Sequence, residues 1–141
     1  MPFTGNYATN TYKNGLNTGT FNLGTGTTQV FKIALYTNAA TLDSTTTGYT
    51  TSGEVTDAGY TAGGQILTVS QVPTVGSSGT TSYYSFSNVS WSGAITARGA
   101  LIYKVGANGA ICVLDFGSDK ISNTTFTVQM PADGPTSSLI R

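Results

Sequence analysis

The sequence predicts an all-β fold: a single-domain antiparallel β-sandwich or jelly-roll-like barrel of residues 21–141, preceded by an extended N-terminal arm of residues 1–20. Short runs of alternating apolar and polar residues, separated by turn residues, are typical of sandwiches and barrels. Gly and Thr disfavour helix interiors and are spread throughout, and helical periodicity is nearly absent. The 141 residues are enough for one domain with one core.

The first 29 residues are polar and punctuated by glycines, which predicts the arm and one short candidate strand at residues 21–23. The next segment, residues 30–37, alternates strictly and predicts a strand with two different faces. One face carries Phe31, Ile33 and Leu35, and the other carries Lys32, Ala34 and Tyr36. Residues 38–64 are rich in turn residues and predict either a functional loop or short strands without a clear pattern.

The second half of the chain predicts most of the remaining strands. Residues 65–72 form a run that is expected to end at Pro73, and residues 82–91 alternate with a change of parity that predicts a bulge near Asn88. Further strands are expected at 98–105, 110–116 and 125–130, with a short one at 139–141. The segment Gly106–Gly109 is a hairpin signal. The total is about seven to nine strands, antiparallel because the connections are too short for crossover helices.

Composition limits the possible functions. Only 9% of the residues are charged, against about 25% in ordinary soluble domains, and six positive charges balance six negative ones. A nearly neutral surface favours association and lacks the clustered Lys and Arg that nucleic acids require. The low charge is equally compatible with a Thr-rich sheet that simply needs few charges. No apolar run is long enough for a membrane helix, and the polar N-terminus predicts no signal peptide, so synthesis in the cytoplasm is expected.

The chain contains no histidine, which excludes Ser-His-Asp and Cys-His nucleophile systems. Asp115 and Asp119 follow a strand and could bind calcium together, although turn formation explains them more simply. Glu54 and Asp57 flank a turn in the same way. The single Cys112 lies in an apolar run and is expected to pack as a small hydrophobe. We therefore predict no catalytic, cofactor-binding or metal-binding residues, and no enzymatic activity.

Six residues are candidates for contacts with a partner protein. Exposed aromatic side chains can stack on sugars or on other proteins, although tyrosine is also common in sheets for packing alone. Arg98 opens an apolar strand and is expected to pair with a carboxylate or carbonyl, within the chain or across an interface. The candidates are Tyr7, Tyr12, Phe21, Tyr49, Tyr60 and Arg98.

Several spaced blocks of the sequence resemble a family of small structural proteins encoded by tailed bacteriophages. The resemblance covers about residues 20–130 in order, and includes the strand Lys-Ile-Ala-Leu-Tyr-Thr at residues 32–37. The other matching blocks are 42–47, 49–55, 59–64, Trp91, 96–103 and 113–120. The resemblance implies a virion structural protein without a catalytic role, and it supplies no functional residues.

Three functions follow as hypotheses. The first is a capsid decoration or cement protein that forms homotrimers and bridges neighbouring subunits of the major capsid protein, with residues 1–20 acting as a stapling arm. Deleting this arm should then leave the domain folded and weaken attachment. The second is a tail or fibre component, an adaptor or a module that binds a host glycan through exposed tyrosines and residues 38–64. The third is a carboxylate-dependent glycan hydrolase. The first two place the protein in the virion, without nucleic acid, membrane or cofactor.

Overall fold

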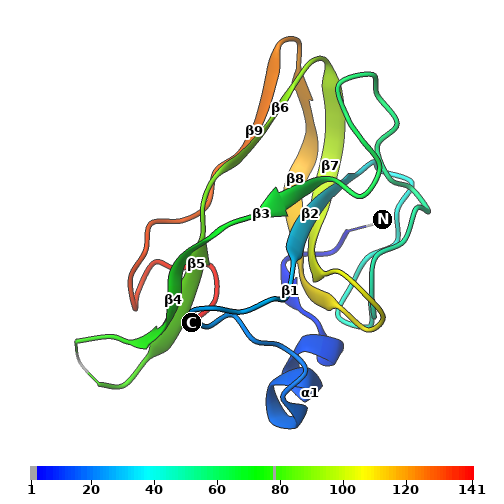
Figure 1. Cartoon of the computed structure of the whole chain (residues 1–141). Coiled ribbons are helices and arrows are strands. Elements are labelled where there is room, and N and C mark those ends of the chain that lie inside the picture. Colours follow the sequence, from blue (N-terminus) through cyan, green and yellow to red (C-terminus); the bar gives the residue numbers. More distant parts are fainter. Residues whose placement is uncertain (1–2, 78) are drawn as a thin grey trace.

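The computed structural model describes residues 3–77 and 79–141, which form nine strands and one short helix (Figure 1). The central sheet is antiparallel with the strand order β1-β8-β7-β2-β3. Its strands are β1 (Tyr7–Ala8), β2 (Phe31–Tyr36), β3 (Gln65–Leu67), β7 (Ile95–Lys104) and β8 (Ala110–Ser122). The predicted all-β, sandwich-like fold is confirmed, and the described residues form no closed barrel.

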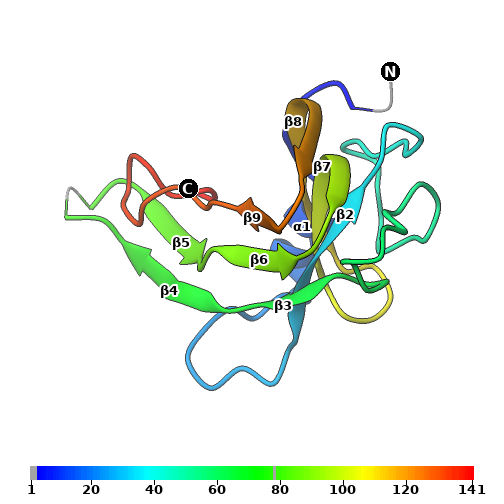
Figure 2. The same ribbon diagram turned by 90° about the horizontal axis from the view of Figure 1, so that it is seen from above.

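A second layer of strands packs on one face of the central sheet (Figure 2). It consists of two antiparallel pairs, β4 (Val69–Val75) with β5 (Ser82–Phe86), and β6 (Val89–Ser92) with β9 (Thr125–Val128). The parity change near Asn88 is the point where the chain leaves one pair and enters the other. The predicted bulge at Asn88 is therefore wrong: β5 ends at Phe86 and β6 begins at Val89.

Strand β2 lies in the middle of the molecule, and its alternation is as predicted. Phe31, Ile33 and Leu35 belong to the apolar core shared with the second strand layer. Ala34 and Tyr36 belong to a separate core on the opposite face of the sheet. The central sheet is thus covered on both faces, which explains why nearly every residue of β2 and β7 is buried.

The opposite face is covered by residues 37–64, which we call the loop cover. This stretch contains no strand; its one ladder contact is the isolated bridge between Tyr36 and Glu54. Its apolar side chains Ala40 and Leu42 are nevertheless buried against the sheet. Gly64 has a φ of 70°, and a Cβ there would lie 1.7 Å from the Ile33 carbonyl oxygen, so the close approach of the loop requires glycine.

The prediction of an extended arm for residues 1–20 is wrong for the part that the structure describes. Residues 7–8 form β1 at the edge of β8, and α1 (Asn10–Thr18) follows. Thr9 caps the helix, since its hydroxyl accepts from the Tyr12 amide at 3.1 Å, and Gly19 ends it with a φ of 74°. Phe3 and Tyr12 are buried in the two cores. This segment is therefore part of the folded domain.

Several predicted strands also differ from the structure. The single strand predicted at residues 65–72 divides at Thr68 into β3 and β4. Strand β4 continues through Pro73 and pairs with β5 alone, and an edge strand tolerates proline. Residues 21–23 are not a strand, whereas β8 extends beyond the predicted end to Ser122. The C-terminal segment makes only an isolated bridge, between Tyr84 and Ile140.

Candidate interaction surfaces

Arg98 makes its contacts within the chain. Its guanidinium forms an ion pair with Asp115 of the neighbouring strand β8 and lies 5.6 Å from the centre of the Phe3 ring. Arg98 is only 8% exposed. Its expected pairing with a carboxylate is confirmed as an intrachain contact, and we therefore remove it from the candidate partner-binding residues.

Asp115 has ordinary turn partners in addition to Arg98. Its carboxylate accepts a hydrogen bond from the Gly117 amide at 2.8 Å. The guanidinium of Arg98 and this amide lower the pKa of Asp115 below its usual value. Among residues 3–77 and 79–141, no group of three or more His, Cys, Asp or Glu side chains is arranged to hold a metal ion.

Tyr12, Phe21 and Tyr60 are also buried, contrary to their proposed role in partner binding. The ring centres of Tyr12 and Phe21 lie 5.2 Å apart, and the Tyr84 hydroxyl donates to the Tyr12 hydroxyl at 2.8 Å. Burial raises the pKa of Tyr12. Tyr12 and Phe21 stabilise the contact between α1 and the strand layer, whereas the centre of the Tyr60 ring lies 6.1 Å from that of Trp91.

Tyr7 and Tyr49 remain accessible. The half-buried Tyr7 lies in β1, and its hydroxyl is 2.6 Å from the Thr4 hydroxyl. Tyr49 is 36% exposed and stacks on Tyr103 of β7, with ring centres 5.1 Å apart and planes within 18° of parallel. The structure thus keeps two of the six candidates at the surface, at separate places.

The sequence analysis missed the role of Glu54, which lies at the centre of the loop cover. This buried carboxylate accepts hydrogen bonds from the hydroxyls of Tyr49 and Tyr60, both at 2.6 Å, and from the Gly63 amide at 2.7 Å. Burial and the adjacent Glu54 raise the pKa of Tyr49 to about 12. The sequence contained one signal for this role: Glu54 is a lone glutamate between two tyrosines in a Gly/Thr-rich stretch. A buried carboxylate needs several hydrogen-bond donors, and tyrosine hydroxyls can supply them.

A hollow of about 560 Å³ opens beside this carboxylate, and we call it the tyrosine hollow. Lys32 of β2 and Tyr103 of β7 line it from the sheet. The loop cover contributes residues 47–50 and 62–63, and the β7–β8 turn contributes residues 105–108. The hollow therefore lies where the loop cover meets the end of the central sheet.

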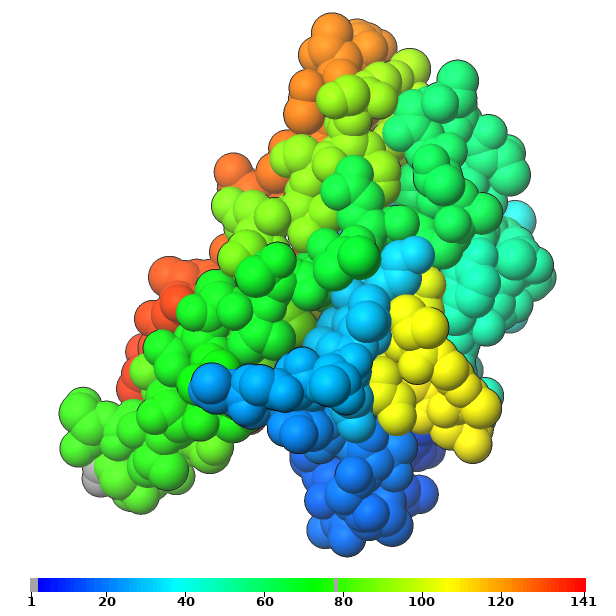
Figure 3. Space-filling model, in the orientation of Figure 1, coloured from blue at the N-terminus to red at the C-terminus, as the bar shows by residue number. Residues whose placement is uncertain are grey.

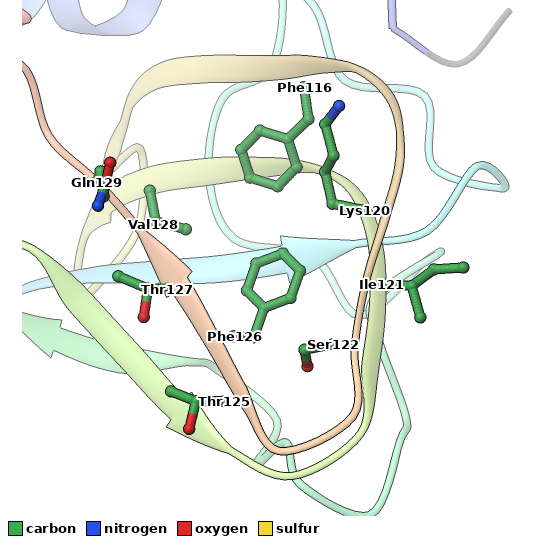
Figure 4. Close-up of a pocket in the computed structure, with 9 residues that line it drawn as sticks. All are labelled: Phe116, Lys120, Ile121, Ser122, Thr125, Phe126, Thr127, Val128 and Gln129. Carbon is green, nitrogen blue, oxygen red and sulfur yellow. The ribbon is translucent and has the colours of Figure 1, made fainter.

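A second opening lies between β8 and β9, which separate after the turn at residues 123–124 (Figure 4). We call this opening of about 440 Å³ the β8–β9 cleft. Figure 4 shows the rings of Phe116 and Phe126 between the two strands, and their centres are 6.2 Å apart. Ile121 borders the cleft, its side chain is directed outward in Figure 4, and it is 73% exposed.

A third opening separates α1 from the hairpin of β4 and β5. Figure 3 shows these two parts as separate projections with a notch between them. The notch has a volume of about 620 Å³ and is lined by Tyr12 and Leu16 of α1 and by Tyr84 of β5. Leu16 is 55% exposed. The notch is mainly apolar, with Lys13 and Arg141 as its charged lining residues.

No helix among the described residues is long and apolar enough to cross a membrane. The comparisons with known proteins give no relative: no family model, no curated protein and no solved structure matches this chain.

Proposed function

We propose that this chain is a structural subunit of a viral particle that acts by binding other protein chains, without chemistry. The resemblance of about residues 20–130 to structural proteins of tailed bacteriophages supports the viral context. The absence of histidine and the scarcity of charged residues agree with a binding role.

The main support for this proposal is the second half of β8, residues 116–122. Residues 110–115 of β8 pair with β7, and two of them also pair with β1. Residues 116–119 lie at a register shift and have no described strand partner. Residues 120–122 pair with β7 on one edge. An unpaired strand edge beside the apolar β8–β9 cleft is a template for a strand from another chain.

The side chains of this edge are suited to protein contact. Ile121 exposes most of its surface, so its burial by a partner would contribute about 1.5–3 kcal/mol. Asp119 and Lys120 add one charge of each sign, which can fix the register of an incoming strand. A single contact of this size is weak, but repetition by symmetry gives high avidity.

The specific role that we propose is capsid decoration. Copies of the chain would form a closed homotrimer and bridge neighbouring subunits of the major capsid protein on the outer shell. The edge of β8 would supply the contact with the capsid. Because the N-terminal segment is part of the domain, an arm no longer belongs to this mechanism.

A tail or fibre component is the second candidate, and the tyrosine hollow favours it. An accessible aromatic ring beside polar groups, here Tyr49 stacked on the buried Tyr103, is a feature of glycan-binding sites as well as of protein interfaces. In this case the protein would act as an adaptor or would bind a host glycan.

A particle-binding experiment tests the proposal. Purified protein, sized by light scattering, is mixed with particles that lack it, and the particles are pelleted and imaged. The variant Ile121→Asp places a charge on the β8 edge, and Val75→Asp is the control because Val75 is an exposed apolar residue of β4. Regular binding over the head that Ile121→Asp abolishes and Val75→Asp preserves would support capsid decoration. Binding only at the tail would favour the second candidate, and a monomer that binds neither would contradict both.

A further inference from the structure

The tyrosine hollow contains a lysine without a partner. Lys32 is half-buried in β2, between Tyr103 of β7 and Ile66 of β3 in the registers of the sheet. Within the described residues its ammonium group makes no hydrogen bond or ion pair, and the one ion pair there is Arg98–Asp115. A half-buried, unpaired charge is unfavourable, so this group is suited to an anionic ligand.

The neighbouring carboxylate does not fill this role. The two oxygens of Glu54 accept hydrogen bonds from the hydroxyls of Tyr49 and Tyr60 and from the Gly63 amide. It forms no ion pair with Lys32. Gly63 has a φ of 88°, and a Cβ there would lie 3.3 Å from the Lys32 nitrogen, so glycine keeps space free beside the ammonium group.

The aromatic wall of the hollow is held in place before any ligand binds. Tyr49 stacks on Tyr103, and the hydroxyl of each ring is fixed, Tyr49 on Glu54 and Tyr103 on the Gly63 carbonyl oxygen at 2.8 Å. A fixed ring loses little entropy when a ligand packs on it. The C–H groups of a sugar carry the partial positive charge that the face of an aromatic ring attracts.

The rest of the lining is uncharged and combines polar groups with the apolar Ala62, Val105 and Ala107. Thr47 and Thr50 supply hydroxyls, and Asn108 supplies an amide on the turn between β7 and β8. These groups both donate and accept hydrogen bonds, which matches the hydroxyls of a sugar. The volume of about 560 Å³ is within the usual range for small-molecule sites, about 300–1,000 Å³.

We propose that the tyrosine hollow binds an acidic sugar, with the ligand carboxylate on Lys32 and the sugar ring against Tyr49, which stacks on the buried Tyr103. The chemical class is a uronic or sialic acid residue. A carboxylate side chain of a partner protein is the competing occupant, but hydroxyl and amide groups around the cation favour a polyhydroxylated ligand. This inference deepens the second candidate function, glycan binding at the tyrosine hollow, and is tested separately from the position of the protein in the particle.

The test is a nuclear magnetic resonance titration of the isotope-labelled full chain. The probes are glucuronate and the methyl glycoside of N-acetylneuraminate, with glucose as the neutral sugar and N-acetylglutamate amide as the peptide carboxylate. The amides of Gly48, Gly63 and Asn108 border the hollow and report binding. We expect saturable shifts with at least one acidic sugar and weaker or no shifts with glucose and the capped glutamate.

Two matched variants locate the site. Lys32→Gln removes the cation and should weaken acidic-sugar binding by at least about tenfold, since a hydrogen bond to a charged group is lost. Lys120→Gln removes an exposed lysine of β8 and should leave binding unchanged. An equal response to the capped glutamate, insensitivity to Lys32→Gln, or no response to either acidic sugar would overturn the inference. Binding to particles is a separate readout, so its failure would not affect this result.

Discussion

The two faces of the central sheet are covered in different ways. On one face, strands β4, β5, β6 and β9 pack through an apolar core that includes Phe86, Trp91 and Phe126. On the other face, the loop cover contains no strand and combines apolar contacts of Ala40 and Leu42 with hydrogen bonds, while its Val55 and Tyr60 side chains join the first core. The Tyr36 hydroxyl donates to the Thr50 carbonyl oxygen at 2.7 Å, and the Leu35 amide donates to the Tyr60 hydroxyl at 3.0 Å.

The difference shows that a long irregular segment can act as a layer of a sandwich. Tyrosine does so efficiently, because its ring fills the apolar space and its hydroxyl satisfies a backbone or carboxylate group of the loop. We expect the strand layer to depend on apolar burial and the loop cover to depend on hydrogen bonds with defined geometry. The following predictions test this contrast.

The largest effect is expected from the segment that contributes to both faces. Deleting residues 1–20 removes Phe3 from one core and Tyr12 from the other, so the truncated chain should lose its cooperative unfolding transition. The point variant Tyr12→Ala should cost about 3–5 kcal/mol of unfolding free energy in urea. Leu16→Ala, on the exposed side of α1, is the control and should cost under about 1 kcal/mol. A truncated chain that retains the full transition would restore the arm hypothesis.

The strand-covered face should be the next most sensitive. Leu35 is fully buried in β2, so Leu35→Ala should lower the free energy of unfolding by about 2–5 kcal/mol through lost burial and a residual cavity. The exposed Ile66 of β3 is the matched control, and Ile66→Ala should change stability by less than about 1 kcal/mol. Equal effects would mean that β3 is covered in solution.

The loop-covered face should respond to a change that preserves volume. Glu54→Gln replaces an acceptor of three hydrogen bonds by an amide that must also donate, so we expect a cost of about 1.5–3 kcal/mol. Hydrogen exchange should accelerate at Gly63 and Val55 more than at Ile102 in the sheet. As a control, Tyr36→Phe removes one neutral hydrogen bond and should cost about 1 kcal/mol. Uniform acceleration over the whole chain would contradict the idea of a separately anchored cover.

The smallest effect concerns the ion pair between β7 and β8. The pKa of Asp115 is lowered, so its contribution is fully present above the usual carboxyl value of 3.8 and is lost as the pH falls through the lower value of the folded state. Asp115→Asn should therefore cost about 1 kcal/mol at pH 6 and progressively less below about pH 4. The control Asp119→Asn, which alters an exposed carboxylate, should cost less than about 0.5 kcal/mol at pH 6. A constant Asp115→Asn effect down to pH 2 would contradict the assignment.

Several elements were predictable because the physical signal is local. The alternation of residues 31–36 assigns each side chain to one face, since successive residues of a strand point in opposite directions. The β7–β8 turn was predictable from its Asn-Gly pair. Asn108 has a φ of 52°, which asparagine tolerates, and a Cβ on Gly109 would lie 1.9 Å from the Lys104 carbonyl oxygen.

The missed elements depend on contacts between distant residues. Helix α1 has a sequence with poor helix propensity, Asn-Thr-Tyr-Lys-Asn-Gly-Leu-Asn-Thr, and forms because Tyr12 packs on Phe21 and Gly15 allows a close approach to that ring. Glu54 was interpreted as a turn residue. Its hydrogen-bond partners come together only when the loop folds back on the sheet, and the sequence pattern does not show this. The ion pair between Arg98 and Asp115 was partly predictable, since the charge of Arg98 in an apolar strand requires a partner.

The rate at which the buried thiol of Cys112 reacts with an alkylating reagent can report how often the edge of the sheet opens. Cys112 lies on β8 opposite Ala8 of β1, and burial raises its pKa to about 12. Only the thiolate reacts with alkylating reagents, so modification requires the sheet to open. As the single cysteine of the chain, it makes the labelling rate a measure of how often the N-terminal strand and helix detach. A lower labelling rate after assembly than before it would show that a partner holds β1 against β8.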